Sequence, residues 1–333
     1  MIDRRLMKRK KRCVLGLLVL LVLTGCARQK EPIQKTGLYF NTVIQITLYD
    51  DSEKELIEQC FQMADRYEKM LSVTCEESDV WKMNHAGGQS IIVSEETGYL
   101  LEEALRYSVL TEGYIDPTIG ALSSLWDFSS NEEKTVPSQT YIQNALEKIG
   151  YEKIRIENKA DGYEVCLTEG AQIDLGFIAK GYIADKMKEY LMANNVEHGI
   201  INLGGNVLTI GTKPTGELFS IGIKKPFSEH GETITDISVN DKSVVSSGIY
   251  ERCFESDGKL YHHILNTKTG YPIENDLYHV TIVSDSSMQG DALSTACLVL
   301  GKEKGMELIE QTPGCEAVFV TNTYEIYKTS GLN

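Results

Sequence analysis

Asp174 and Lys180 flank a glycine-containing turn between an apolar run and a segment with helical spacing. Residues 172–175 are predicted to form a short buried strand that stops at Gly176, and apolar residues from Ile178 onward recur as on one face of a helix. The start of a helix offers free N–H groups and the positive end of its dipole. This turn therefore suits an anionic ligand such as a pyrophosphate. On this stretch alone, a capped surface helix is the alternative.

A second pair of oxygen-bearing side chains lies near the C-terminus. Asp291 and Thr295 are four residues apart in a segment with helical spacing, so they share one face of the helix. Both oxygens can reach a single hard cation such as Mg²⁺. A carboxylate that only stabilises the start of its helix is the alternative.

Three further segments interrupt apolar runs with polar residues or glycine. The Gly-Gly in residues 202–206 permits either a hairpin turn or the close approach of a flat ring or phosphate. Residues 246–252 place hydroxyls, a glycine and an arginine at the start of a strand, where a bulge with a surface ion pair is the alternative. His262 and His263 are adjacent in a strand and face opposite sides, so a metal pair is disfavoured and one of them is a candidate acid or base.

The elements that position these residues form a mixed pattern. Helices are predicted over residues 52–71, 94–113, 137–150, 178–193, 288–300 and 304–311, with a loop over 72–90. Strands are predicted over residues 38–49, 154–156, 163–167, 173–175, 199–203, 206–210, 219–223, 234–239, 243–245, 250–255, 260–265, 280–284, 317–320 and 324–328. Because strands and helices do not alternate strictly, the predicted class is α+β rather than a doubly wound parallel sheet. The length allows one large domain or two intimately packed lobes.

The N-terminus has the features of a bacterial export signal. Seven basic residues precede a short apolar run over residues 14–23, which is a secretion signal rather than a membrane span. The run ends in Leu-Thr-Gly-Cys, which resembles a lipobox, so residues 1–25 are predicted to be removed and Cys26 to carry the lipid. An uncleaved N-terminal anchor helix is the alternative. Residues 26–36 are then a tether and residues 37–333 the domain, which works outside the cytoplasm at the bacterial membrane.

Charge and cysteine content limit the classes of partner. The chain has 33 basic and 48 acidic residues, of which seven basic residues and one acidic residue lie in the predicted signal. The predicted mature chain therefore has 26 basic and 47 acidic residues and a formal charge near −21. Such an acidic surface repels nucleic acid, so that class of partner is set aside, and a phosphate site needs local cations or a metal ion. Six scattered cysteines remain without metal-site spacing, so zinc is disfavoured. Buried free thiols are predicted, and a disulfide stays open in an oxidising compartment.

Taken together and in this order, the segments resemble the ApbE family, the FAD:protein FMN transferases formerly called thiamine biosynthesis lipoproteins. The lipobox also fits this family. The resemblance covers nearly the whole predicted mature chain and rests on residues 113–120, 174–181, 202–206, 247–252, 263–272 and 291–296.

The resemblance implies a T-fold-related mixed sheet with packed helices. It also implies an enzyme that cleaves FAD at its pyrophosphate, passes FMN to a Thr or Ser hydroxyl of a partner flavoprotein and releases AMP. Mg²⁺ is the expected cofactor. The expected acceptor is an FMN-bearing subunit of a membrane redox complex or an extracellular electron-transfer flavoprotein.

The same resemblance implies a set of site residues. The metal ligands are the Phe177 carbonyl, Asp291 and Thr295. The residues expected to contact FAD are Phe40, Thr74, Tyr114, Ile115, Asp116, Asp174, Lys180 and Ile264. Transfer at phosphorus depends on charge neutralisation and in-line placement. His263 is the candidate base near the acceptor hydroxyl, and Asp291 is the second candidate catalytic residue.

Several positions depart from the family pattern. Phe177 stands where Gly or Ala is usual, and Ala121, Asn266, Gly290 and the Asn-Thr pair at 41–42 also differ. None of these removes a proposed metal ligand. Two other functions remain open: a pyrophosphatase that splits FAD into FMN and AMP with water as acceptor, and a non-enzymatic flavin-binding lipoprotein.

Overall fold

The structure, a computed structural model, describes residues 31–49, 54–130, 133–228 and 231–332. Ile33–Asn333 forms one compact unit. The predicted signal, Cys26 and the predicted helix start at Ser52 lie outside the described residues. No described helix is long and apolar enough to cross a membrane.

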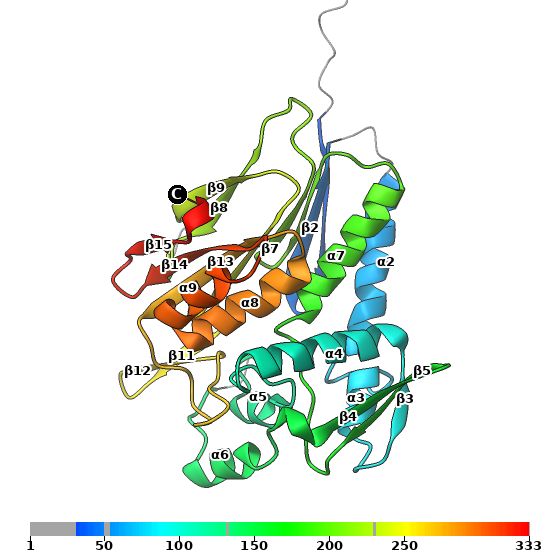
Figure 1. The fold of residues 1–333 in the computed structure, drawn as a ribbon, viewed down its shortest axis with the longest axis vertical. Coiled ribbons are helices and arrows are strands. Elements are labelled where there is room, and N and C mark those ends of the chain that lie inside the picture. Colours follow the sequence, from blue (N-terminus) through cyan, green and yellow to red (C-terminus); the bar gives the residue numbers. More distant parts are fainter. Residues whose placement is uncertain (1–30, 50–53, 131–132, 229–230, 333) are drawn as a thin grey trace, which may run out of the picture. The chain divides into compact units, whose positions relative to one another are not determined.

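A single antiparallel sheet organises the unit (Figure 1). Its strands, in spatial order, are β1 (Ile33–Tyr39), β2 (Thr42–Leu48), β6 (Gly199–Leu203), β7 (Asn206–Ile210), β10 (Ser243–Gly248), β13 (Leu277–Ser284), β14 (Glu316–Thr321) and β15 (Ile326–Lys328). Every neighbouring pair is antiparallel. The sheet therefore confirms the α+β class and the single-domain alternative.

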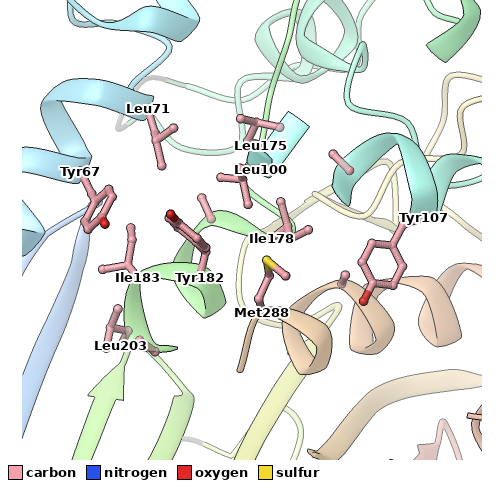
Figure 2. Close-up of a cluster of buried hydrophobic side chains, with 14 of the residues drawn as sticks. Tyr67, Leu71, Leu100, Tyr107, Leu175, Ile178, Tyr182, Ile183, Leu203 and Met288 are labelled. Atoms are coloured by element: carbon pink, nitrogen blue, oxygen red, sulfur yellow. The ribbon is translucent and has the colours of Figure 1, made fainter. Parts of the chain in front are cut away.

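Alternate residues of these strands face two different layers, as the period of a strand requires. Val244 packs under the hairpin of β8 (Phe219–Lys224) and β9 (Thr233–Val239), whereas Val245 faces α8. The helical layer consists of α2 (Lys54–Leu71), α7 (Ala179–Ala193), α8 (Ser287–Leu300) and α9 (Lys302–Glu310). Figure 2 shows its core, in which Tyr67 of α2, Tyr182 of α7 and Met288 of α8 gather.

The remaining elements lie at the lower end of the unit in Figure 1. They include a three-stranded sheet of β3 (Ile91–Val93), β5 (Gly162–Leu167) and β4 (Ile154–Lys159), and the hairpin of β11 (Cys253–Ser256) and β12 (Lys259–His262). The helices here are α3 (Asp79–Asn84), α4 (Glu95–Leu110), α5 (Gly120–Trp126) and α6 (Gln139–Leu146), with short 3₁₀ turns at Tyr151–Lys153 and Ser330–Leu332. Ser94 and Ser138 cap α4 and α6.

Three predictions about local structure were wrong. Residues 38–49 are not one strand but part of the β1–β2 hairpin, because Phe40 and Asn41 both adopt the left-handed conformation of a tight turn, with φ of 53° and 54°. The predicted loop over 72–90 contains α3, and β3 was missed. β1 begins at Ile33, so the end of the predicted tether belongs to the sheet.

The predicted strand over residues 172–175 was also wrong. Only an isolated parallel bridge joins Gln172 to Ile119. The backbone of Ile173 exchanges two hydrogen bonds with the Asn84 side chain, at 2.6 and 3.0 Å. These bonds satisfy the backbone without a neighbouring strand.

Candidate active site

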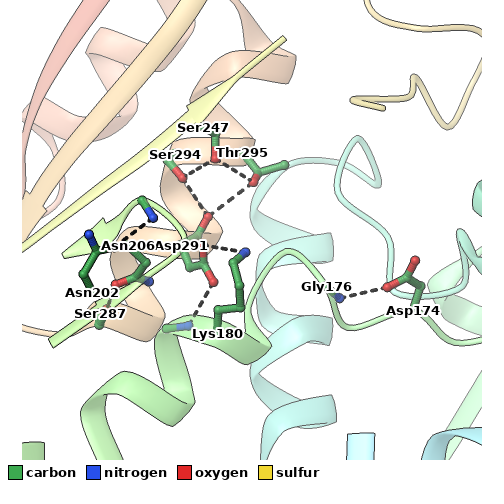
Figure 3. Close-up of polar contacts among 12 residues, drawn as sticks. Asp174, Gly176, Lys180, Asn202, Asn206, Ser247, Ser287, Asp291, Ser294 and Thr295 are labelled. Carbon is green, nitrogen blue, oxygen red and sulfur yellow. Dashed lines mark hydrogen bonds and ion pairs between the residues drawn. The ribbon is translucent and has the colours of Figure 1, made fainter. Parts of the chain in front are cut away.

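The first turn of α7 meets the N-terminal part of α8 at a buried carboxylate (Figure 3). Oδ2 of Asp291 accepts a 2.9 Å hydrogen bond from the N–H of Gly181, and Oδ1 lies 3.8 Å from Nζ of Lys180. Asp291 is 4% exposed. Burial raises its pKa, while the Lys180 charge and the Gly181 N–H act in the opposite direction. A desolvated carboxylate with one ammonium at this distance is only partly compensated, so the position favours a second cation.

Gly181 permits the two helices to approach this closely. A Cβ at Gly181 would lie 2.2 Å from the Ser287 carbonyl oxygen. The Gly181 N–H lies in the first turn of α7, where it has no acceptor within the helix, and it bonds to Asp291. Among the described residues, the Phe177 carbonyl receives no backbone hydrogen bond. The first turn of α7 therefore leaves a carbonyl oxygen available beside a buried carboxylate.

Hydroxyl groups surround the backbone of α8 at the same level. Oγ of Ser247 on β10 lies 2.7 Å from Oγ of Ser294 and 3.4 Å from Oγ1 of Thr295. Ser294 and Thr295 each donate to the Asp291 carbonyl, at 2.9 and 3.3 Å. Asp291 and Thr295 therefore share one helical face, as predicted, and β10 contacts that face.

Asp185, one turn further along α7, fixes the start of α8. Its carboxylate accepts from the N–H groups of Ser287 and Met288 at 2.7 and 3.0 Å and from the Ser286 hydroxyl at 2.7 Å. The Ser287 hydroxyl donates to Oδ1 of Asn206, at the end of the Gly-Gly turn, at 2.5 Å. Free N–H groups at a helix start need such acceptors. The 202–206 turn thus contributes to positioning α8.

Glu251 and His263 belong to the surroundings of the Lys180–Asp291 pair. Burial of the carboxyl raises the pKa of Glu251 to about 7, with the Lys180 charge opposing, although part of the residue is solvent-exposed. Burial and the nearby charge of Arg252 lower the pKa of His263 to about 3. The imidazole of His263 is therefore neutral near pH 7, and its low pKa makes it a weak proton acceptor in this state. Its Nδ1 is buried and has no partner among the described groups.

A second group of predicted residues lies where the chain leaves α4. Asp116 is buried, and its carboxylate accepts from the N–H and hydroxyl of Thr118 and from the N–H of Tyr151, at 2.6 to 2.9 Å. These bonds offset the desolvation that raises its pKa. Nζ of Lys268 lies 6.0 Å from the centroid of the Tyr114 ring. A cavity of about 290 Å³ opens beside Gly113, Asp116, Thr267 and Lys268.

The other predicted contacts to FAD are distributed around the unit. Phe40 forms the β1–β2 turn, where its N–H donates to Glu68 at 2.8 Å, and Thr74 is exposed after α2. Asp174 accepts from the Gly176 N–H at 2.9 Å and lies apart from the Asp291 group in Figure 3. Ile115 and Ile264 are buried. The described contacts unite Lys180, Asp291 and Thr295 but do not link them directly to these residues.

The donors near Asp291 fit Mg²⁺. They are a carboxylate, a hydroxyl and a free carbonyl, all oxygen atoms, which this cation prefers. No cluster of three or more His, Cys, Asp or Glu side chains suited to a metal occurs among the described residues. The six predicted mature cysteines have free thiols there, and Cys60, Cys166, Cys297 and Cys315 are buried.

A larger cavity, of about 830 Å³, lies between α4, α7 and the start of α8. It is lined by Tyr99, Lys186, Glu189 and their neighbours and contains none of the predicted site residues. Acidic and basic side chains are mixed in its lining, and no set of polar groups points to one position in it. The buried Asp291 carboxylate is therefore the better candidate for the active site.

The sequence matches the ApbE family model over residues 40–319. The chain belongs to the ApbE family. It is 38% identical to the FAD:protein FMN transferase of Klebsiella pneumoniae (strain 342), covering 89% of this chain and 91% of that protein. Identity to the FAD:protein FMN transferase of Treponema pallidum is 31%, covering 92% and 89%.

Solved structures of ApbE proteins have the same fold. The crystal structure of the ApbE protein of Thermotoga maritima aligns with a TM-score of 0.83 at 31% identity, covering 90% of this chain and 98% of that one. The flavin transferase ApbE of Vibrio cholerae gives 0.80 at 26% identity, covering 91% and 98%. The resemblance and the fold class predicted from the sequence are confirmed.

Sequence reasoning did not assign roles to Ser247, Asp185 or Glu251. Ser247 belongs to the 246–252 segment, for which no contact with α8 was predicted. Which of its hydroxyl groups faces α8 depends on strand pairing, and a local pattern does not give that pairing. Asp185 is an acidic residue within an apolar helical stretch. Such a position signals a buried acceptor with specific partners.

Proposed function

We propose that this chain is a Mg²⁺-dependent FAD:protein FMN transferase that attaches FMN to a Thr or Ser hydroxyl of a partner flavoprotein and releases AMP. The names of the related proteins support the activity. The observation that carries the proposal here is the buried Asp291 carboxylate, held by the first turn of α7 beside Lys180. That arrangement collects charges of both signs where a pyrophosphate and its cation would be held.

In the proposed reaction the acceptor hydroxyl attacks the phosphorus of the FMN half of FAD. A new P–O bond forms, the bond to the bridging oxygen breaks, and the electron pair leaves with AMP. Asp291, Thr295 and the Phe177 carbonyl would hold Mg²⁺, which neutralises phosphate charge when bound. Lys180 provides a second positive charge for the same oxygens.

His263 is the proposed proton acceptor for the attacking hydroxyl. Its lowered pKa keeps it neutral at physiological pH, and its buried Nδ1 has no protein partner within the described part of the chain. A pKa this low makes the imidazole a weak base in the free protein, so the proposed proton transfer requires the negative phosphate groups of FAD to raise its pKa when they bind nearby. Phe40, Thr74, Tyr114, Ile115, Asp116, Asp174 and Ile264 are proposed to surround the rest of FAD.

We further propose that residues 1–25 are a lipoprotein signal and that Cys26 carries the lipid. The basic start, the apolar run and Leu-Thr-Gly-Cys in the sequence support this proposal. The domain would then act outside the cytoplasm at the cell membrane. An acceptor in a membrane redox complex or an extracellular electron-transfer flavoprotein is within reach of such an enzyme.

Mass spectrometry of an acceptor tests the function directly. The full-length chain in detergent is incubated with FAD, Mg²⁺ and an FMN-binding domain known to be flavinylated on threonine. We expect a mass gain equal to FMN less one water, an equimolar amount of AMP, and loss of both with Asp291→Ala. AMP and free FMN without an adduct would identify the pyrophosphatase instead. Intact, bound FAD with an unmodified acceptor would identify a flavin-binding protein.

A further inference from the structure

Four aromatic side chains from separate segments form one surface cluster, named here the aromatic surface: Phe227, Tyr250, Tyr278 and Tyr324. The ring centroids of Phe227 and Tyr278 are 5.1 Å apart, those of Tyr278 and Tyr324 5.5 Å, and those of Phe227 and Tyr250 5.8 Å. The Tyr324 hydroxyl donates to the Pro226 carbonyl at 3.4 Å, which joins the β8–β9 and β14–β15 loops. The cluster is therefore a continuous feature of the fold.

Two of these residues have unfavourable backbone conformations without the benefit of full burial. Phe227 and Tyr324 have φ of 57° and 63° and remain 43% and 40% exposed. Bulky side chains rarely adopt this left-handed region, and glycine or asparagine would fill such turn positions with less strain. Since the core gains little from either ring, their presence indicates a role at the surface.

The aromatic surface adjoins the surroundings of Asp291. Tyr250 directly precedes Glu251, whose carboxyl interacts electrostatically with Lys180 and Asp291. The backbone of the next residue, Arg252, accepts a 3.1 Å hydrogen bond from the N–H of His263. The same short segment thus contributes to the aromatic surface and to the environment of the proposed proton acceptor.

Basic side chains lie at the Tyr250 end of the aromatic surface, whereas exposed Asp276 and Glu325 lie near Tyr278 and Tyr324. Nζ of Lys224 lies 5.7 Å from the centroid of the Tyr250 ring, and both Lys224 and Arg252 are exposed. The chain as a whole carries a formal charge of −15. Lys224 and Arg252, which both act on the Glu251 carboxyl, attract acidic side chains of a partner to the Tyr250 end of this surface.

We propose that the aromatic surface docks the acceptor protein, and that this partner presents acidic side chains around the hydroxyl that receives FMN. The inference rests on the proposed function and deepens it. Exposed aromatic rings with basic neighbours are typical of protein interfaces. Docking here would bring the acceptor hydroxyl next to the Glu251–His263 region.

Steady-state flavinylation of the acceptor domain by the full-length chain tests this inference. The variants are Phe227→Gly and Tyr324→Gly, which remove a ring and relieve backbone strain, and Lys224→Glu. We expect each to raise KM for the acceptor about tenfold, as loss of an interface anchor does, while kcat and the Kd for FAD, from flavin fluorescence, stay unchanged. The glycine variants keep or raise the melting temperature. Tyr141→Ala, which removes a 64% exposed ring on α6, is the matched control.

The outcomes separate this inference from the function on which it rests. Unchanged KM in all three variants overturns the docking surface while the transferase stands. A lowered melting temperature with unchanged KM shows that the rings are structural. Loss of self-association, or of binding to anionic phospholipid vesicles, with unchanged KM assigns the surface to a second copy or to the membrane. No adduct with the unaltered chain overturns the function itself.

Discussion

The N–H of Gly181 donates a 2.9 Å hydrogen bond to the carboxylate of Asp291, across 110 residues of sequence. The bond satisfies an N–H of the first turn of α7, which has no acceptor within that helix. The Phe177 carbonyl, just before the helix, has no backbone donor among the described residues. The contact therefore orients the carboxylate near a carbonyl oxygen that is still available.

The first prediction concerns the close approach at Gly181. Alanine favours a helix interior over glycine by roughly 0.5–1 kcal/mol, yet Gly181→Ala places a Cβ 2.2 Å from the Ser287 carbonyl oxygen. We expect a net loss of about 1–3 kcal/mol in the free energy of unfolding in urea, because two packed helices must separate. Met192→Ala, on the exposed part of the same helix, is the control. Unchanged stability in Gly181→Ala would contradict the tight contact.

Asp185 supports the second prediction. Asp185→Ala leaves the N–H groups of Ser287 and Met288 without their acceptor, which costs about 1–3 kcal/mol of stability. Flavinylation falls as well, since α8 carries Asp291 and Thr295. Glu189→Ala, an exposed carboxylate one turn later, is the control for charge removal. Equal effects of the two substitutions would show that the capping bonds are unimportant.

Metal addition and removal give the third prediction. Mg²⁺ raises the melting temperature of the unaltered chain, because a ligand at a hundred times its Kd stabilises the folded state by about 2.7 kcal/mol. EDTA reverses the shift. Asp291→Asn and Thr295→Val abolish it, and Asp291→Asn lowers flavinylation by about 10²-fold or more. Asp285→Asn, which neutralises an exposed carboxylate near the start of α8, leaves the Mg²⁺-dependent shift and the flavinylation rate unchanged. A Mg²⁺ shift that persists in Asp291→Asn would place the cation elsewhere.

The fourth prediction is a pH dependence of stability from His279. Burial lowers the pKa of this imidazole to about 4, against an ordinary 6.5. Between these values the unfolded chain binds a proton that the folded chain does not, so stability falls as pH drops below 6.5. His279 alone lowers the free energy of unfolding by roughly 2 kcal/mol at pH 5. Urea unfolding at pH 7.5 and 5.0 measures it. An equal drop in His279→Gln would assign the effect to other groups.

Local signals predicted part of the fold well. The two strands around the Gly-Gly turn, β6 and β7, were predicted to the residue, because glycines between alternating apolar residues mark a hairpin. The β1–β2 hairpin was missed because phenylalanine is not a turn residue. The bonds between Asn84 and Ile173 join segments 89 residues apart, and no local pattern announces them.

The site was predicted to a similar extent. Helical spacing placed Asp291 and Thr295 on one face, and the structure confirms this relation. The proximity of Lys180 to Asp291 was not predicted, because the two residues lie far apart in the sequence and no local pattern pairs them. Ser247 could not be assigned to this group, since one residue of register decides whether its hydroxyl faces α8 or the opposite layer.

The order of strands in the main sheet also bears on the folding of this site. Between α7 and α8 the chain forms β6, β7, β10 and β13, which occupy consecutive positions in that sheet. The contact between Lys180 and Asp291 therefore joins segments separated by four paired strands, and contacts at such large sequence separation slow folding. A ligand bound by both residues would stabilise the pairings between them rather than one segment.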